Sequence, residues 1–272
     1  MKLSIITINF NNAEGLRKTI ESVVSQTFTD YEYIVIDGAS TDESVDVIKQ
    51  YTDKITYWVS EFDKGIYNAM NKGILKAKGE YCLFLNSGDW LVDEDVIKDF
   101  CNACFKEDIV SGNIFLLENE KDNILVKAVS LENITYDFFM NNIIYHQSTF
   151  IKRSLLMQCG MYSETYKIVS DWEFFIKALI AQNCTYAHFD RNITYFVKGG
   201  VSGQQQWMTL HLQEREKVFK LLPRIHKMYM QNIQTTQNMQ SVVNEYMHLK
   251  NGSFGFIIRF LLCLKRLKRK QK

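Results

Sequence analysis

The alternation of strand-like and helix-like segments over the first 90 residues is the feature that most constrains the fold. Four short runs rich in β-branched and aromatic residues predict strands at 3–8, 31–37, 55–60 and 81–85. Apolar residues at helical spacing predict helices over the intervening segments 13–27, 40–51 and 64–79. Strands that alternate with helices form a largely parallel sheet covered on both faces, so we expect an α/β, Rossmann-like fold.

Polar and acidic side chains follow each predicted strand. They are Asn9 after the first, Asp37 at the end of the second, Asp63 after the third, and Asn86 and Asp89 after the fourth. In open α/β sheets, ligands bind outside the carboxyl ends of the strands. We therefore expect a binding site at this edge.

The motifs at this edge favour a metal over a glycine-rich phosphate loop. Neither a G-x-G-x-x-G sequence after the first strand nor a G-x-x-x-x-G-K-[ST] sequence is present. A diphosphate can also be held through a divalent metal, and hard oxygen ligands suit Mg²⁺ or Mn²⁺. The sequence predicts Asp89 as the ligand that anchors such a metal.

Charge is unevenly distributed along the 272 residues. The segment 259–272 holds seven basic residues and no acid, and the remainder is mildly acidic, so we expect no nucleic-acid binding. The apolar stretch within 254–272 is shorter than the roughly 20 residues that span a bilayer. Followed by basic residues, it predicts an anchor at an anionic membrane surface, with a helix packed on protein as the alternative.

The cysteines and the first residues predict a reduced, cytoplasmic protein, and the basic segment 254–272 places it at the inner face of the cell membrane. Of six cysteines only Cys101 and Cys104 are close, and no second pair or nearby histidine completes a zinc site. The first residues enter a strand pattern without the features of a signal peptide.

The second half of the chain is less regular. A helix over 170–182 carries Asp171 in its first turn, and the glycines of 197–206 predict a mobile loop. Beyond that loop the pattern is helical, so we expect one domain over 1–205 and a helical extension over 206–272. The segment 206–250 is long enough to pair with another copy in a homo-oligomer.

Five stretches, in order, resemble successive motifs of the family 2 glycosyltransferases with the GT-A fold. They are SIITINFNN, IVIDGASTDES, DKGIYNAMNKGI with AKGEYCLFLNSGDWL, YHQSTFIKRSLL and SDWEFFIKAL. The resemblance covers residues 2 to 203. It implies a transferase that uses a nucleoside-diphosphate sugar and extends a glycan or lipid-linked glycan in bacterial surface polysaccharide synthesis.

The resemblance implies a role for each residue that matches a motif. The nucleotide-sugar contacts would be Thr7, Asn9, Phe10, Asp37, Asp63 and Asn86, with Phe10 packed on the base. Gly38 stands where relatives carry a second acid, and NSGD at 86–89 stands where many carry DSDD.

The resemblance also implies the chemistry. Asp89 would hold Mn²⁺ or Mg²⁺, Asp171 would be the base of an inverting displacement, and His146 would lie on the acceptor side. Two rivals stay open. A sugar nucleotidyltransferase would need a glycine-rich basic loop that NFNNAEG does not provide, and a binding protein with eroded acids would fit the changes at 86 and 88.

Overall fold

The structure is a computed structural model that describes residues 1–119, 122–182, 184–197 and 207–221. The chain divides into two compact units, 1–218 and 219–272. The glycines of 198–206, the basic tail of 254–272 and the predicted extension apart from 207–221 lie outside the described residues. The predicted boundary at 205, the anchor and the homo-oligomer therefore stay predictions.

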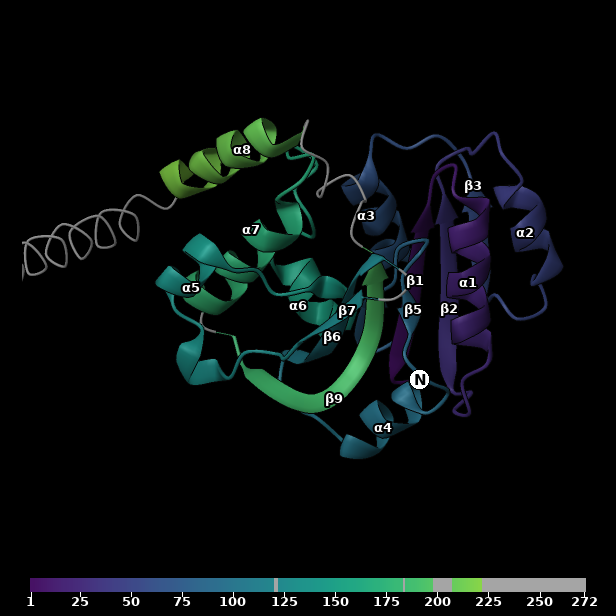
Figure 1. Ribbon diagram of the computed structural model, residues 1–272, viewed down its shortest axis with the longest axis horizontal. Coiled ribbons are helices and arrows are strands. Elements are labelled where there is room, and N and C mark those ends of the chain that lie inside the picture. The colour runs from purple at the N-terminus through teal and green to yellow at the C-terminus, as the bar shows by residue number, and fades with distance from the viewer. Residues whose placement is uncertain (120–121, 183, 198–206, 222–272) are drawn as a thin grey trace, which may run out of the picture. The chain divides into compact units, whose positions relative to one another are not determined.

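The core of the first unit is one sheet. Its strands, among the described residues, follow the order β3-β2-β1-β4-β8-β6-β9-β5, with β7 paired to β6 (Figure 1). The strands β1, β2, β3, β4, β6 and β9 share one direction, and β5, β7 and β8 run against them. The bounds are β1 Leu3–Asn9, β2 Tyr31–Asp37, β3 Tyr57–Ser60, β4 Tyr81–Phe84, β5 Trp90–Leu91, β6 Ile109–Asn119, β7 Asp122–Val126, β8 Thr149–Lys152 and β9 Tyr186–Val197. The predicted mostly parallel α/β sheet is confirmed.

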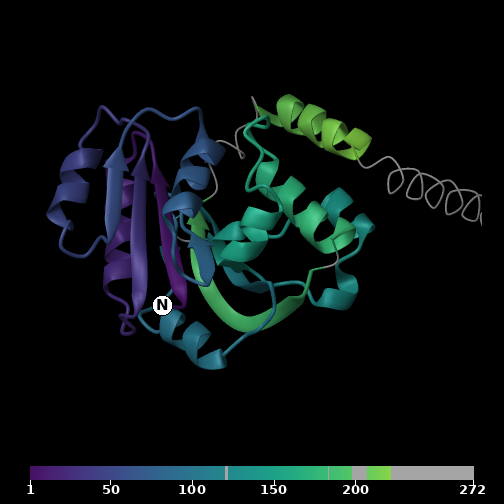
Figure 2. The same cartoon turned by 180° about the vertical axis from the view of Figure 1, so that it is seen from behind.

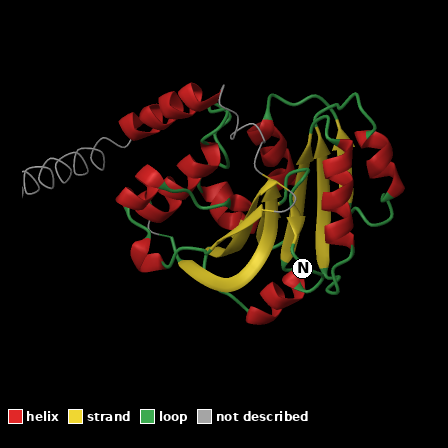
Figure 3. Ribbon diagram, in the orientation of Figure 1, coloured by secondary structure: helices red, strands yellow, loops and turns green. Residues whose placement is uncertain are grey.

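Helices flank this sheet, as Figures 2 and 3 show. The α-helices are α1 Ala13–Val24, α2 Ser44–Gln50, α3 Ile66–Lys76, α4 Val96–Ala103, α5 Tyr136–Asn141, α6 Arg153–Gln158, α7 Ser170–Ile176 and α8 Met208–Leu221. Two short 3₁₀ helices are η1 Leu131–Asn133 and η2 His146–Ser148, and η3 Lys177–Ala181 is a π-helical segment. None of the described helices is both long and apolar enough to cross a membrane.

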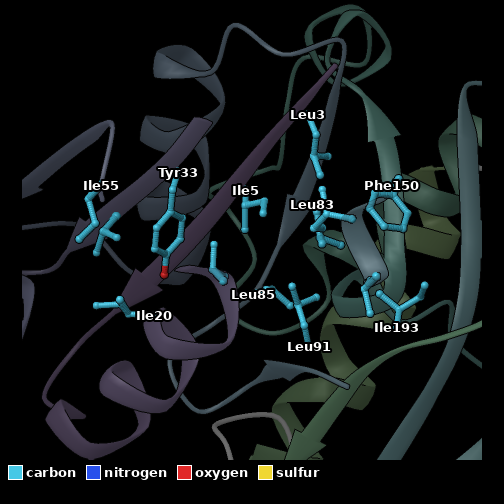
Figure 4. Close-up of a cluster of buried hydrophobic side chains, with 14 of the residues drawn as sticks. Leu3, Ile5, Ile20, Tyr33, Ile55, Leu83, Leu85, Leu91, Phe150 and Ile193 are labelled. Carbon is cyan, nitrogen blue, oxygen red and sulfur yellow. The ribbon is translucent and has the colours of Figure 1, made fainter. Parts of the chain in front are cut away.

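Alternation along β1 divides its side chains between two layers. Leu3 and Ile5 enter a buried cluster that also contains Ile20 of α1 (Figure 4). Ile6 points to the opposite face, where a Cβ added to Gly73 of α3 would lie 2.4 Å from Ile6 Cγ2. The lack of a side chain at 73 thus lets α3 pack directly on the sheet.

The parallel register brings three strand ends together. Asn9 of β1 is paired with Asp37 of β2, and Asp37 is paired with Ser60 of β3. The chain leaves all three strands at the same edge. The fold therefore places the segments after β1, β2, β3 and β4 at one edge of the sheet, the edge at which the sequence predicts a binding site.

Candidate functional site

Asp37 joins the ends of three neighbouring strands. Its side chain is fully buried. Its Oδ1 accepts hydrogen bonds from Asn9 Nδ2 at 2.7 Å and from Ser40 Oγ at 2.6 Å. Its Oδ2 accepts from the Ser40 amide at 3.0 Å and from Ser60 Oγ at 2.6 Å. Four donors use the acceptor capacity of the carboxylate, so its work here is to fix the strand ends.

Asn9 and Thr7 occupy different environments on β1. Asn9 is 4% exposed, and its Oδ1 is buried with no hydrogen-bond partner among the described residues, so it has an acceptor to offer a ligand. Thr7 is fully buried, and its Oγ1 lies 3.0 Å from the Tyr33 hydroxyl. The structure does not bring the Thr7 side chain to the sheet edge.

Phe10 and Asp63 form an exposed corner beside Gly38. The Phe10 side chain is 65% exposed. A Cβ added to Gly38 would lie 2.5 Å from Asp63 Oδ2 and 3.3 Å from Phe10 Cδ2. Asp63 Oδ1 accepts a hydrogen bond from the Gly65 amide at 2.8 Å, which fixes the carboxylate. The corner combines a flat ring for stacking with a fixed carboxylate that can accept hydrogen bonds.

The turn after β4 is pinned to α1. Thr19 Oγ1 donates to the Asp89 carbonyl at 2.7 Å and accepts from the Gly88 amide at 3.0 Å. Gly88 has a φ of 102°, in the region that favours glycine. The apolar strand gives way to NSGD because this tight turn returns the chain to β5 and directs Asp89 inward.

The Asp89 carboxyl is held in an unusual environment. It is 4% exposed, and burial raises its pKa well above the usual value, opposed by a hydrogen bond with the backbone at Asn86. Asp89 Oδ2 and Asn86 Oδ1 are both buried and have no hydrogen-bond partner among the described residues. A buried acceptor without a donor is costly, so these two oxygens suit a ligand that supplies positive charge or a donor.

The two oxygens are of the chemical kind that a divalent cation takes as ligands. Carboxylate and amide oxygens are the ligands that Mg²⁺ and Mn²⁺ prefer. Within the described ranges, no group of three or more His, Cys, Asp or Glu side chains could hold a metal. Asp89 and Asn86 would therefore need further ligands from a bound phosphate.

A second cluster comes from distant parts of the chain. His146 of η2 is 7% exposed, and its Nδ1 donates to Asp171 Oδ2 at 2.9 Å. The hydroxyl of Tyr67, on α3, lies 2.9 Å from Asp171 Oδ1 and 2.6 Å from the Ile168 carbonyl oxygen, so its single proton is shared between these two acceptors. Burial raises the pKa of Asp171, but the hydrogen bond and charge of His146 and the hydrogen bond from Tyr67 outweigh burial and lower it overall. The carboxylate is ionised at neutral pH and can accept a proton.

An imidazole joins the two clusters. Asn86 Nδ2 lies 3.4 Å from His146 Nε2, which accepts this weak hydrogen bond when Nδ1 carries the proton. A continuous polar chain therefore runs from Asn86 through His146 and Asp171 to Tyr67. Sequence reasoning missed Tyr67, because its place in the helical pattern of α3 resembles that of an ordinary core residue.

Comparison with known proteins identifies relatives of this chain. Residues 4–158 match the family model described as glycosyl transferase family 2. An uncharacterized glycosyltransferase of Mycobacterium tuberculosis is 31% identical over 198 residues, which cover 69% of this chain and 74% of that protein. A PGL/p-HBAD biosynthesis glycosyltransferase of Mycobacterium bovis is 30% identical and covers 64% of this chain and 68% of that protein.

Two solved structures share the fold. TarS 1-349 of S. aureus in complex with UDP has a TM-score of 0.60 at 21% identity, covering 72% of this chain and 60% of that one. The mannosyltransferase PcManGT from Pyrobaculum calidifontis, in complex with GDP-Man and Mn2+, has a TM-score of 0.59 at 15% identity, covering 82% and 64%. This chain therefore spans less than two thirds of either solved structure.

Proposed function

The chain belongs to glycosyl transferase family 2, and on that premise we propose that it transfers a sugar from a nucleoside-diphosphate sugar to a glycan or lipid-linked glycan, with inversion, in bacterial surface polysaccharide synthesis. The observation that carries the proposal is the polar chain from Asn86 through His146 to Asp171. It links the turn suited to a metal and diphosphate with a carboxylate that can accept a proton.

Asp171 is the base in this proposal. An acceptor hydroxyl oxygen bonds to the anomeric carbon from the face opposite the diphosphate. The bond from that carbon to the diphosphate oxygen breaks, and its electron pair leaves with the diphosphate. The hydroxyl proton passes to Asp171, whose two oxygens are oriented by His146 and Tyr67.

The donor occupies the edge formed by β1, β2, β3 and β4. The nucleobase stacks on the exposed ring of Phe10, and the Asp63 carboxylate beside that ring accepts a hydrogen bond from the nucleobase or the ribose. Asp37 and Asn9 keep the strand ends fixed beneath it. Asp89 and Asn86 would hold Mn²⁺ or Mg²⁺, which supplies charge stabilisation to the departing diphosphate.

The membrane and self-association proposals concern residues outside those described. The basic segment 254–272 would hold the enzyme at an anionic membrane surface, at the inner face of the cell membrane, where a lipid-linked acceptor is found. The segment 206–250 would pair two copies. Flotation with anionic and with neutral vesicles, using the full chain and a chain ending at residue 253, tests the first of these proposals.

Titration calorimetry of UDP and of GDP, each with and without Mn²⁺, tests the donor site. We expect metal-dependent binding of one nucleotide by the wild type and its loss in Asp89→Asn. Asp53→Asn is the matched control, because it makes the same change at a side chain that is 73% exposed and is not assigned to the site. Absence of binding by either nucleotide would favour the eroded binding protein.

A second variant separates binding from chemistry. Asp171→Asn should bind the nucleotide as the wild type does and lose transfer by about 10²- to 10⁴-fold, the usual contribution of a positioned base. Hydrolysis of the donor sugar provides the readout before the acceptor is known. Unchanged hydrolysis in Asp171→Asn would reject the assignment of the base.

A further inference from the structure

A pocket of about 780 Å³ lies outside the residues assigned to the donor. It is bounded by β6, the segment after β7, the end of α5 and the residues that lead into η2, with α8 contributing two side chains. Its volume is that of a site for a small molecule. The donor residues Phe10, Asp63 and Asp89 do not line it.

The pocket is lined by three basic side chains, two that are commonly charged and one histidine that can gain a proton. Lys127 follows β7, and His211 and Arg215 lie one turn apart on α8. The lining contains no aspartate or glutamate. Burial and the charge of Arg215 lower the pKa of His211, opposed by the charges of Asp171 and Glu214, so the imidazole is neutral at pH 7.

Arg215 is positioned for a ligand and retains donor capacity. Its guanidinium lies 4.5 Å from the centre of the Trp172 ring, and Nη1 donates to the Met140 carbonyl at 3.2 Å. Its Nε is buried and has no hydrogen-bond partner among the described residues. A guanidinium that is stacked, held at one corner and short of acceptors is a typical site for an oxyanion.

The pocket adjoins the base through neighbours in the chain. Tyr145 and Ser148 line it and flank the segment that contains His146. Trp172, on which Arg215 stacks, directly follows Asp171. Asp171 also acts electrostatically on His211 and on Arg215, so a molecule in the pocket would lie near this carboxylate.

We propose that this pocket binds a phosphate group of the acceptor, held by Arg215 and Lys127 with His211 beside them. That the phosphate belongs to the acceptor rests on the proposed transfer reaction. That the pocket binds a phosphate rests on the pocket alone. Two permanent cations and a titratable imidazole match the several oxygens of a phosphate. The volume leaves room for the sugar or lipid group that the phosphate carries.

Binding of small phosphates to the full chain tests the proposal. The probes are hexyl phosphate, glucose 1-phosphate and inorganic phosphate, with hexanol and glucose as the neutral counterparts of the first two. All are titrated with saturating UDP present, so that the donor site does not take up the phosphate. We expect the phosphates to bind and the neutral counterparts to fail.

Variants place the binding in the pocket. Arg215→Gln and Lys127→Gln should each weaken hexyl phosphate at least about tenfold, the effect of losing one charge-assisted hydrogen bond. Lys217→Gln removes the same charge from an exposed position on α8 outside the pocket and should bind as the wild type does. Lys127 is exposed, so its variant keeps the test valid if Arg215→Gln fails to fold.

The outcomes separate this proposal from the transferase proposal. Stronger binding of hexyl phosphate than of glucose 1-phosphate would identify a lipid phosphate, and the reverse a phosphate within a glycan. Equal affinities for hexyl phosphate in the wild type and the three variants would overturn the proposed phosphate site, and so would no binding of any phosphate to the wild type. Phosphate binding without nucleotide binding would instead overturn the transferase and leave the anion site in place.

Discussion

Replacement of His146 tests the link between Asp171, the proposed base, and the turn at 86–89. The hydrogen bond from Nδ1 to Asp171 and the charge of His146 help lower the pKa of that carboxyl. His146→Gln places its amide at the reach of Nε2, near Asn86, and removes the donor to Asp171. His146→Asn places its amide near the position of Nδ1 and keeps that donor. The two variants therefore break the polar chain at different points.

The expected loss in His146→Gln follows from the removed bond. A hydrogen bond to a charged group contributes about 1.5–3 kcal/mol, which corresponds to about 10- to 150-fold in an equilibrium. Without it, burial raises the pKa of Asp171 with less opposition, so the carboxyl is protonated at a higher pH. A protonated carboxyl cannot accept the acceptor proton. The activity relative to wild type should fall as pH is lowered, by at most that factor.

The assay is donor hydrolysis measured as kcat/KM from pH 5 to pH 8. His146→Asn serves as the control and should follow the wild-type profile in shape. The same profile for His146→Gln and the wild type would refute the reasoning, as would an equal displacement in both variants. A uniform loss at all pH values would instead assign His146 a purely structural role.

Three other changes test other parts of the site and fold. Gly38→Ala puts a methyl group 2.5 Å from Asp63 Oδ2, so the carboxylate must move, and calorimetry should show nucleotide affinity reduced about tenfold, the effect of one lost hydrogen bond. In Asp89 burial raises the pKa, so wild-type stability is lost as pH rises from the usual range of the unfolded carboxyl toward the raised pKa of the folded one. Asp89→Asn does not titrate, so its stability relative to wild type should be higher at pH 8 than at pH 4 in urea denaturation. Glu32 is buried and accepts hydrogen bonds from Ser4 Oγ and from the Gly79 amide, so Glu32→Ala leaves buried donors unpaired and should cost about 2–4 kcal/mol by the same method. Unchanged affinity, an unchanged difference between the two pH values, or a loss below 1 kcal/mol, respectively, would contradict these three.

The sheet edge could be predicted because it depends on local patterns. Alternating strands and helices fix a parallel sheet, and a parallel sheet brings its carboxyl ends to one edge. The helix predicted at 40–51 begins later, at Ser44, because the Ser40 hydroxyl is bonded to Asp37 and does not cap the helix. A residue that serves the site is thus not available for the role its local sequence suggests.

The contacts across the chain could not be read from the sequence. His146 reaches Asn86 only because β8 pairs with β4 in the antiparallel direction, which brings η2 beside the turn at 86–89. Thr7 shows the converse limit. It shares a motif with Asn9 and Phe10, but it lies two residues before the end of β1, and its hydroxyl faces Tyr33 inside the core. Motif membership did not distinguish the two environments.

The polar chain gives a reason for the amide at position 86. His146 Nδ1 is committed to Asp171, and Nε2 faces residue 86 at 3.4 Å. An ionised aspartate at 86 has no proton to offer Nε2, so the polar chain would be broken there. Asparagine can donate from Nδ2 to Nε2, while its Oδ1, which has no partner among the described residues, is left for a cation or for a donor on the diphosphate. The amide thus keeps the chain to Asp171 continuous, and in the proposed metal site Asp89 and the phosphates would have to supply the charge that an acid at 86 would have added.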